Sequence, residues 1–327
     1  MALNIREIKN KQKSISNIGQ IARAMELVSV TKMRRSQRVA LASRPYAKAA
    51  FTILKDIKQT TSASKSYFFG IKELNGARNF AKNKKRTAVL LITTDKGLCG
   101  GLNTNVFRKA ENLITDLISD VPKTDYPIID FVIIGKKGEE WCARKKFNII
   151  KSFNNFGDYI EFTETAPVAE FIINLFKNGG YEKIFAVYTN FISALKQFAT
   201  AREILPLNEN ILQEIIKGMI PQSGKFSEAF GKPQDEGGAA QEINFEYMFE
   251  PKAEEILDGI LYSLVETEIY YIILENNASE HSARRMAMKN AYENADEMKR
   301  ELNLKHNKAR QAGITQELTE IASAANI

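Results

Sequence analysis

The chain has 327 residues, of which 44% are apolar and 26% charged, the balance of a soluble protein that can bury one large core or two small ones. Its two cysteines, Cys99 and Cys142, are too few for a disulfide scaffold, so we expect a reducing, cytoplasmic setting with both thiols facing the core. No apolar run approaches the ~18 residues of a membrane span, and the first residues lack the apolar stretch of a secretory signal.

The net charge of +7 is unevenly distributed along the chain. Residues 1–60 hold about 13 Lys and Arg side chains against three acids, whereas the part beyond residue 101 is acidic. A basic segment of this kind is typical of a nucleic-acid face, of a surface for an acidic protein partner, or of a plain solvated helix face. The charge alone leaves these three interpretations open.

A long amphipathic helix is predicted at the N-terminus, because residues 3–44 contain no proline and their apolar side chains recur in steps of mostly three and four. Pro45 should kink or restart the helix, and the pattern continues to about residue 58. The expected apolar stripe consists of Ile5, Ile8, Ile15, Ile18, Ala22, Met25, Val28 and Val39.

The middle of the chain, residues 86–206, alternates short apolar runs with helical patterns, which predicts an α/β domain. Such runs suit burial on both faces of a parallel sheet. The expected strands are "TAVLLITT", "DFVIIG" and "KIFAVYTNF", with "FATAREILPL" as a candidate fourth. The expected helices are "TNVFRKAENLITDLIS", "GEEWCARKK" and "APVAEFIINLFKN".

A glycine-rich loop, "GLCGG", follows the first predicted strand and precedes a predicted helix, which is the layout of a phosphate-binding site. However, no Lys-Ser/Thr pair follows it, as a P-loop requires, and the spacing of Gly97, Gly100 and Gly101 does not match G-x-G-x-x-G. We therefore expect a structural turn that lets the helix pack closely on the sheet. We predict no catalytic residue, no cofactor and no metal site.

The C-terminal part contains no proline after Pro251 and carries a near-heptad apolar pattern, which predicts a long helix in a coiled coil. Seventy such residues would extend about 105 Å. Shorter helices broken near "ENNAS" or at Gly313 are the alternative. The expected stripe consists of Leu257, Ile260, Leu264, Tyr271, Leu274, Ala278, Met288, Tyr292, Ala295 and Leu302. Its positions become small or polar from Ala278 to Ala295.

The predicted fold is therefore mixed α/β: a long antiparallel coiled coil of the N- and C-terminal helices with an inserted Rossmann-like domain. We expect four parts, with a variable insert before the last helix. They are an N-terminal coiled-coil helix at 1–58, the α/β domain at 86–206, the insert at 207–249 and a C-terminal coiled-coil helix at 250–327.

Four stretches in this order resemble the gamma subunit of the F-type ATP synthase, of the bacterial type. They are "RAMELVSVTKMRRSQ" (23–37), "TTDKGLCGGLN" (93–103), "ENNASEHSARRMAMKNAYENA" (275–295) and "KARQAGITQELTEI" (308–321). The resemblance implies a non-catalytic rotor shaft, which couples the ion-driven rotation of a membrane c-ring to conformational cycling of the alpha3-beta3 catalytic sites. The implied location is peripheral, at the cytoplasmic face of the bacterial inner membrane.

The resemblance also implies partners and contact residues. The paired helices would stand inside a ring of three alpha and three beta subunits, with the tip at 314–327 in an apolar bearing, and the α/β domain would touch the epsilon subunit and the c-ring. The residues implied to face the alpha/beta ring are Met25, Lys32, Arg34, Arg35, Arg284, Arg310, Gln311, Thr315, Glu317 and Glu320.

Two other functions compete with this interpretation. One is a nucleotide-binding α/β protein that uses the loop from Gly97 to Gly101. The other is a basic coiled-coil nucleic-acid binder that uses "KMRRSQR", which lacks interleaved aromatic residues and a known reading module. We expect no nucleic-acid partner.

Overall fold

The computed structural model describes residues 5–42, 66–69, 86–119, 122, 126–157, 160–178, 180–208 and 253–324, apart from the side chains of 40–42 and 253–256. The predicted helical continuation at 43–58 and nearly all of the predicted insert at 207–249 lie outside these residues. The chain divides into two compact units. The first unit comprises Met1–Thr31 with Arg284–Ile327, and the second comprises Lys32–Ala283.

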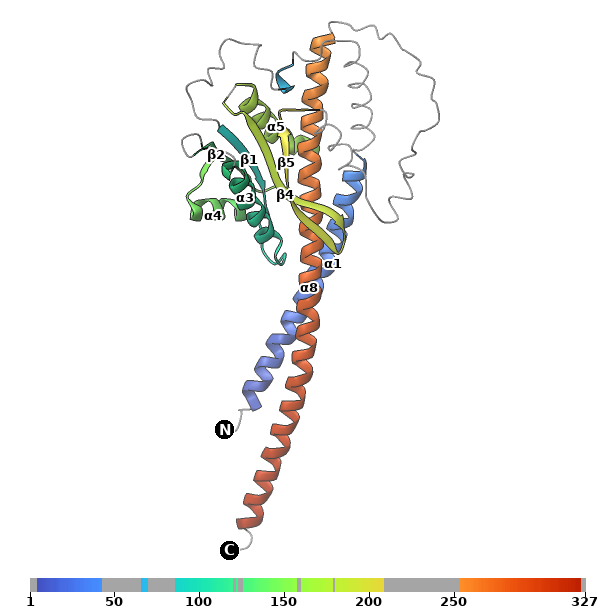
Figure 1. Cartoon of the computed structure of the whole chain (residues 1–327). Coiled ribbons are helices and arrows are strands. Elements are labelled where there is room, and N and C mark those ends of the chain that lie inside the picture. The colour runs from blue at the N-terminus through green and yellow to red at the C-terminus, as the bar shows by residue number, and fades with distance from the viewer. Residues whose placement is uncertain are drawn as a thin grey trace, which may run out of the picture. The chain divides into compact units, whose positions relative to one another are not determined.

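The second unit is built on a five-stranded sheet with the strand order β3-β2-β1-β4-β5 (Figure 1). All neighbouring strands are parallel except β4 and β5, which pair antiparallel. The strands are β1 (Arg86–Ile92), β2 (Ile128–Ile134), β3 (Asn148–Phe153), β4 (Lys183–Ser193) and β5 (Lys196–Leu205).

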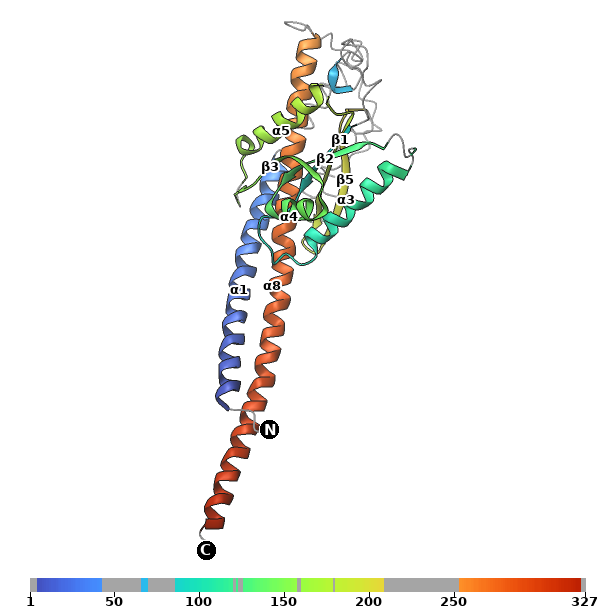
Figure 2. The ribbon, with the colours of Figure 1, turned by 90° about the vertical axis from the view of Figure 1, so that its left-hand side faces the viewer.

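Helices cover both faces of this sheet. The helices in the described residues are α1 (Ile5–Ala42), the short 3-10 helix η2 (Tyr67–Phe69), α3 (Leu102–Ser119), α4 (Lys136–Lys145), α5 (Phe162–Lys177) and α8 (Ala253–Ala324). Figures 1 and 2 show α3 and α4 on one side of the sheet, and α5 with α8 on the other. The predicted mixed α/β fold is therefore confirmed.

The central strand β1 explains why two core layers form. Successive side chains of a strand point to opposite faces, so Val89 and Leu91 pack with α3 and α4, whereas Leu90 and Ile92 pack with α5 and α8. All four side chains are buried. An uninterrupted apolar run is thus what a strand covered on both faces requires.

Two features of the sheet differ from the prediction. Strand β3 was not predicted, because its sequence, "NIIKSF", contains polar residues and its position at the sheet edge leaves it only half-buried. The candidate fourth strand does form, as β5, but it is antiparallel, because only Ala194 and Leu195 separate it from β4. A two-residue connection permits a hairpin and excludes a parallel crossover.

The helix α8 is continuous over 72 residues, which confirms the single long helix and excludes breaks near "ENNAS" or at Gly313. The expected stripe residues on its first part are buried or half-buried, but burial there is not confined to a stripe. Almost every side chain from Leu264 to Ser279 is buried, on all sides of the helix, because the helix forms part of the core of the second unit. Only further along does burial become periodic, at Met288 and Ala295.

A buried carboxylate ties together the amino-terminal ends of the strands. Asp130 on β2 accepts hydrogen bonds from Arg86 Nη2 at 2.6 Å, Tyr181 Oη at 2.8 Å and Asn148 Nδ2 at 2.6 Å. Burial alone would raise the pKa of Asp130, but these three donors and the Arg86 charge hold the pKa below its ordinary value. Asp130 thus links β1, β2, β3 and the segment before β4.

The first unit is an antiparallel pair formed by α1 and the last part of α8 (Figure 2). The contacts run in opposite directions along the two helices. Gln12 donates to Asn303 Oδ1 at 2.9 Å, and the guanidinium of Arg23 lies 5.5 Å from the ring centre of Tyr292. The predicted antiparallel pairing of the terminal helices is therefore confirmed.

Candidate functional site

The glycine-rich loop after β1 forms a tight turn with two residues in the left-handed region, Leu98 at φ 63° and Gly100 at φ 62°. Glycine adopts this conformation without the steric cost that a side chain brings, which explains Gly100. A Cβ added at Gly97 or Gly100 would meet nothing within 4 Å, and one at Gly101 would meet only the Asn105 side chain, at 4.0 Å. These glycines therefore serve the shape of the turn, and no neighbouring element that the structure describes packs closely against them.

The close packing predicted for that loop occurs instead at the next strand-to-helix connection. A Cβ at Gly135 would lie 2.4 Å from the Thr93 carbonyl oxygen, and a Cβ at Gly138 would lie 2.8 Å from Thr93 Oγ1. Thr93 Oγ1 in turn accepts the Gly138 N–H at 2.8 Å. The prediction of a glycine that lets a helix pack closely was therefore right in kind but wrong in place.

The chain's own side chains occupy the positions at which a phosphate would bind to such a sheet. Asp95 follows β1 and accepts the Lys136 N–H at the start of α4 at 3.0 Å and the Asn155 N–H at 3.2 Å. A helix N-terminus is an anion site, and here a carboxylate already fills it. Asn103 closes the glycine loop by bonding both the Thr94 N–H and the Thr94 hydroxyl.

The cysteines behave as predicted, since both thiols are buried. Burial raises the pKa of Cys142 to about 12, so this thiol stays protonated and unreactive. Among the described residues, no group of three or more His, Cys, Asp or Glu side chains is placed to hold a metal ion. Within the same residues, no helix combines the length and the apolarity needed to cross a membrane.

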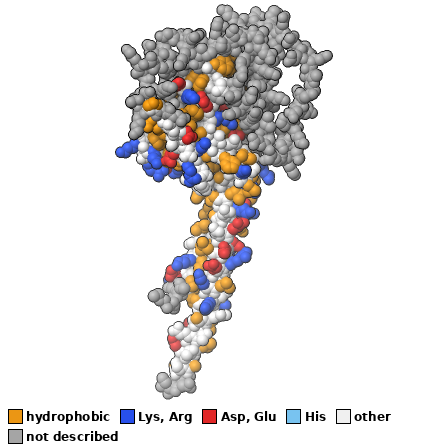
Figure 3. All heavy atoms as spheres, in the orientation of Figure 1, with side chains coloured by type: hydrophobic (Ala, Val, Ile, Leu, Met, Phe, Trp, Pro, Cys, Tyr) orange, Lys and Arg blue, Asp and Glu red, His pale blue; other side chains and the backbone are white. Residues whose placement is uncertain are grey.

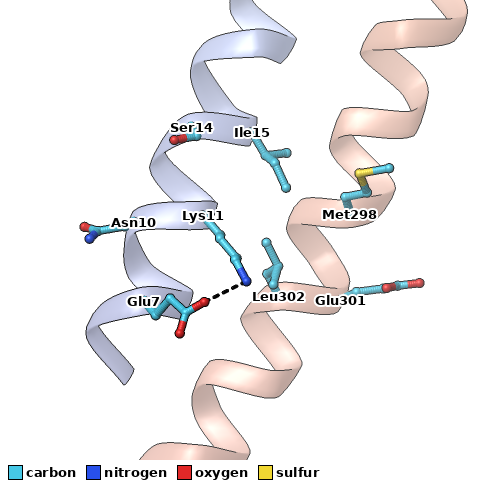
Figure 4. A pocket seen from close by; sticks show the side chains of 8 residues that line it. All are labelled: Glu7, Asn10, Lys11, Ser14, Ile15, Met298, Glu301 and Leu302. Carbon is cyan, nitrogen blue, oxygen red and sulfur yellow. Dashed lines mark ion pairs between the residues drawn. The ribbon is translucent and has the colours of Figure 1, made fainter. Parts of the chain in front are cut away.

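A second candidate surface is the helix pair of the first unit, which contains a groove of about 410 Å³ (Figure 4). Ile15 and Leu302 point into the space between the helices, while Lys11 bridges to Glu7 at 2.9 Å along α1. The lining residues are Glu7, Asn10, Lys11, Ser14, Ile15, Met298, Glu301 and Leu302.

The seam that α1 buries is made mostly of small and polar residues at heptad spacing. The seam positions, buried or half-buried, are Ile8, Gln12, Ile15, Gly19, Ala22, Glu26, Ser29, Met33 and Ser36. Small side chains let the helices approach closely, and a Cβ at Gly19 would lie 3.4 Å from Ala295 Cβ. The Ser29 hydroxyl donates a hydrogen bond to the Met25 carbonyl oxygen, and Glu26 forms an ion pair with Arg23 at 2.6 Å.

The larger apolar residues of α1 form a different, outward face. Ile18, Ile21 and Val28 are each more than half exposed, and with Met25 they follow the spacing three, four, three along the helix. At about 100° per residue these four side chains share an arc of about 80°. The predicted stripe on α1 was therefore wrong, because it merged this exposed face with the buried seam. Figure 3 shows apolar side chains at the surface of the helix pair, among charged ones.

Of the sequence-predicted contact residues of α1, Met25, Lys32 and Arg35 lie on or near this outward face, whereas the helical rotation puts Arg34 on the other side of the helix. Met25 is half-buried within the outward face. Arg34 and Arg35 are exposed and Lys32 is half-buried, about two to three turns beyond Met25 along the same helix. By contrast, Arg284 on α8 is 7% exposed, so its side chain is largely covered within the chain itself.

The end of α8 carries the remaining predicted contact residues, all of them exposed. Ile314, Leu318 and Ile321 form an apolar stripe with spacing i, i+4, i+7, and each is at least half exposed. The polar residues flank this stripe: by the helical rotation, Gln311 and Thr315 fall on one side and Arg310, Glu317 and Glu320 on the other.

Sequence reasoning missed the buried polar residues. Glu26, Ser29 and Ser36 on α1 and Glu268 on α8 are buried, although their residue types are usually exposed. For the three residues of α1, heptad spacing was the only signal, and a search for apolar periodicity does not detect it; for Glu268 the sequence held no such signal.

The fold defines a class: a mixed α/β domain whose core includes part of one long helix, the remainder of which pairs with an N-terminal helix. The model of the ATP synthase family matches residues 4–327. The ATP synthase gamma chain of Roseiflexus castenholzii is 34% identical over 98% of this chain and 97% of its own length. That of Chloroflexus aurantiacus is 35% identical with the same coverage.

Solved structures show the same fold. A chain of the Euglena gracilis mitochondrial ATP synthase, from an OSCP/F1/c-ring structure, matches with a TM-score of 0.58 at 20% identity, over 98% of this chain and 93% of that one. A chain from the central stalk and c-ring of the Tetrahymena thermophila enzyme gives 0.53 at 20% identity, over 83% and 99% of the two chains. The chain belongs to the ATP synthase gamma chain family.

Proposed function

We propose that this chain is the central rotor shaft of an F-type ATP synthase, in which it couples ion-driven rotation of the c-ring to conformational cycling of the catalytic sites. Family membership over the whole chain supports this role. In it the paired helices face a ring of three alpha and three beta subunits, and the sheet domain faces the epsilon subunit and the c-ring. The complex places the chain peripherally, at the cytoplasmic face of the bacterial inner membrane.

The observation that carries the proposal is the pair of apolar faces left exposed on the two helices. One contains Ile18, Ile21, Met25 and Val28 on α1, and the other contains Ile314, Leu318 and Ile321 on α8. Apolar side chains at regular helical spacing favour burial against a partner. An apolar sleeve formed by the ring would cover both.

The predicted contact residues fit this arrangement. Met25 lies within the exposed face of α1, and Arg310 and Glu317 border the stripe at the end of α8. The exposed Arg34 and Arg35 suit acidic loops of the ring. Because Arg284 is largely buried, we assign it to the support of the seam, with at most an edge contact to the ring.

The proposed mechanism involves no bond chemistry in this chain. An asymmetric shaft favours a different conformation in each of three surrounding catalytic sites, and its rotation exchanges those preferences. The four sequence-defined parts, at 1–58, 86–206, 207–249 and 250–327, would then serve as helix, sheet domain, insert and long helix of one rotor.

The rival nucleotide function has no comparable support. Asp95 occupies the N-terminus of α4, so a phosphate there would meet a carboxylate, and the glycine spacing before α3 matches neither phosphate-binding motif. Shaft rotation is therefore the function we test.

A reversible crosslink to the ring tests rotation directly. Met25→Cys would be paired with a cysteine in the facing loop of one beta subunit. We expect oxidation to abolish multi-turnover ATP hydrolysis and reduction to restore it, because one beta subunit would be held in one state. Met25→Cys without the second cysteine is the control. Steady-state activity that persists in a fully crosslinked complex would exclude rotation.

A further inference from the structure

One stretch of α8 inside the sheet domain is apolar on every side. Six consecutive residues, Ile269–Leu274, are all buried and all apolar or aromatic. At about 100° per residue they cover the full circumference of the helix. Burial of apolar area is non-directional, so it holds the helix in the domain but does not decide which side of the helix faces the sheet.

Directional contacts supply that information, and the strongest is a buried ion pair. Arg202 Nη1 on β5 lies 2.6 Å from Glu268 Oε1 on α8. The Glu268 side chain is fully buried and that of Arg202 is 10% exposed. A charge left in this position without its partner would be buried and uncompensated, so any register that separates the two is strongly disfavoured.

Hydrogen bonds continue along the same side of α8. Asn276 Oδ1 accepts the Thr189 N–H at 3.2 Å, and Ser279 donates to the Thr189 carbonyl at 3.1 Å. Ser282 donates to the Ala194 carbonyl at 2.7 Å and accepts from Gln197 Nε2 at 3.0 Å. Every partner belongs to β4, β5 or the turn between them.

These contacts form what we call the polar ladder: Glu268, Asn276, Ser279 and Ser282 on α8, with their partners on the β4–β5 hairpin. The ladder extends about 21 Å along the helix at 1.5 Å per residue. A rotation or a slide of α8 would break all of its rungs at once. The all-round apolar burial of the same segment would survive such a movement far better.

The composition of the ladder favours a role in register over one in stability. A well-packed apolar pair often replaces a buried ion pair without loss of stability. In addition, the second carboxylate oxygen of Glu268 accepts no hydrogen bond from any part of the chain that the structure describes. Buried polar groups of this kind specify one arrangement among several of similar energy.

We propose that the polar ladder locks the rotational and axial register of α8 within the sheet domain, so that torque passes between the domain and the shaft without slip. Arg202, Glu268 and Asn276 are its positioning residues. The lock itself is a property of this chain, whereas its use in torque transfer rests on the proposed rotor function.

The test replaces the ion pair by an apolar pair in the full chain within the assembled complex. R202M/E268M is compared with K183M/E203M, which removes the ion pair between β4 and β5, at 3.7 Å, that does not involve α8. Spin labels at Arg108→Cys on α3 and Glu280→Cys on α8 report the register as a distance distribution. Thermal unfolding, ATP hydrolysis and ion pumping per ATP are measured in parallel.

We expect R202M/E268M to keep its unfolding midpoint within a few degrees and its ATP hydrolysis within twofold. Its distance distribution should broaden or shift, and ion pumping per ATP should fall at least twofold, while K183M/E203M stays at the parent level in every measurement. A merely structural ion pair would lower stability without changing the distance. An unchanged distribution and unchanged coupling in R202M/E268M would overturn the proposal.

A second variant covers the case in which R202M/E268M fails to fold. Asn276→Leu removes one hydrogen bond of the polar ladder without leaving a charge unpaired. We expect the same broadening of the distance distribution and the same loss of ion pumping per ATP. Parent values in both measurements would overturn the proposal.

The parent complex separates the rotor function from the register lock. Absence of any ATP-driven pumping in the parent complex would contradict the rotor function. The distance distributions of the variants would still decide for or against the lock.

Discussion

At the scale of single residues, Asp130 is the clearest determinant of stability. Its carboxylate accepts hydrogen bonds from Arg86, Asn148 and Tyr181, which belong to or adjoin three other strands. We expect Asp130→Asn to lower the free energy of unfolding by about 1–3 kcal/mol at pH 7, because a charged acceptor for several donors is lost. Arg86 is partly exposed, which keeps the loss below that of a fully buried pair.

The pH dependence of this loss gives a sharper measurement. Because the pKa of Asp130 is lowered in the folded state, its stabilisation is complete above the ordinary aspartate pKa of about 4 and disappears as the pH falls through the folded value. The gap in unfolding midpoint between the parent and Asp130→Asn should therefore narrow below about pH 4. Asp296→Asn, at an exposed pair with Arg300, is the control and should show no gap. A gap as wide at pH 2 as at pH 7 would contradict the assignment.

At the scale of elements, the end of α8 allows a test of whether the side of the helix that faces its bearing matters. Deletion of Lys305–Asn307 turns the stripe of Ile314, Leu318 and Ile321 by about 60° relative to the paired part of the helix, at about 100° per residue. We expect the complex to assemble and hydrolyse ATP, but ion pumping per ATP should fall at least twofold because the tip presents a polar side to its bearing. Ion pumping in sealed membrane vesicles measures this.

The matched control replaces Lys305, His306 and Asn307 by alanine, which changes the same side chains but keeps the rotation of the helix. It should couple like the parent. Equal pumping by the deletion and by the alanine variant would show that the facing of the tip does not matter.

The elements also show how far the sequence alone predicts this protein. Strands β1, β2 and β4 were predictable because both of their faces are buried, which requires uninterrupted apolar runs. Strand β3 was not, because an edge strand that is half-exposed tolerates Lys151 and Ser152. The long α8 was predictable from the absence of proline, whereas its all-round burial depends on the sheet domain and leaves no periodic trace.

The candidate surfaces follow the same logic. Small residues such as Gly19 allow two helices to approach closely, so the buried seam of α1 is poorer in large apolar residues than its outward face. A search for apolar periodicity therefore selects the wrong side of such a helix. Glu268 and Asn276 could not be singled out from the sequence for a different reason: their hydrogen-bond partners are more than 60 residues away in the chain.

At the scale of the whole molecule, the rotor model requires that the paired helices turn as one body. The structure supplies a suitable bridge, because a Cβ at Gly19 would lie 3.4 Å from Ala295 Cβ, close to the separation of about 3.8 Å in a disulfide. We expect G19C/A295C to form the bridge on oxidation and to keep ATP hydrolysis and ion pumping within about twofold of the reduced state. Oxidised and reduced samples of one preparation are compared.

The single variant Gly19→Cys under the same oxidant controls for damage to other subunits. A reversible loss of activity only in the bridged variant would mean that α1 and α8 move against one another during turnover, and the helix pair would then not act as a rigid shaft.

The place of α8 in the chain has a consequence for biogenesis. Leu90, Ile92 and Ala186 lie on the sheet face that packs with Leu261, Leu264 and Ile273, which a ribosome makes only after about 60 further residues beyond β5. Until then that face is covered by α5 but not by α8, whose contacts with it are distant in sequence and slow to form. The nascent chain must therefore keep an apolar sheet face shielded, so this protein should depend on chaperones during synthesis more than its size suggests.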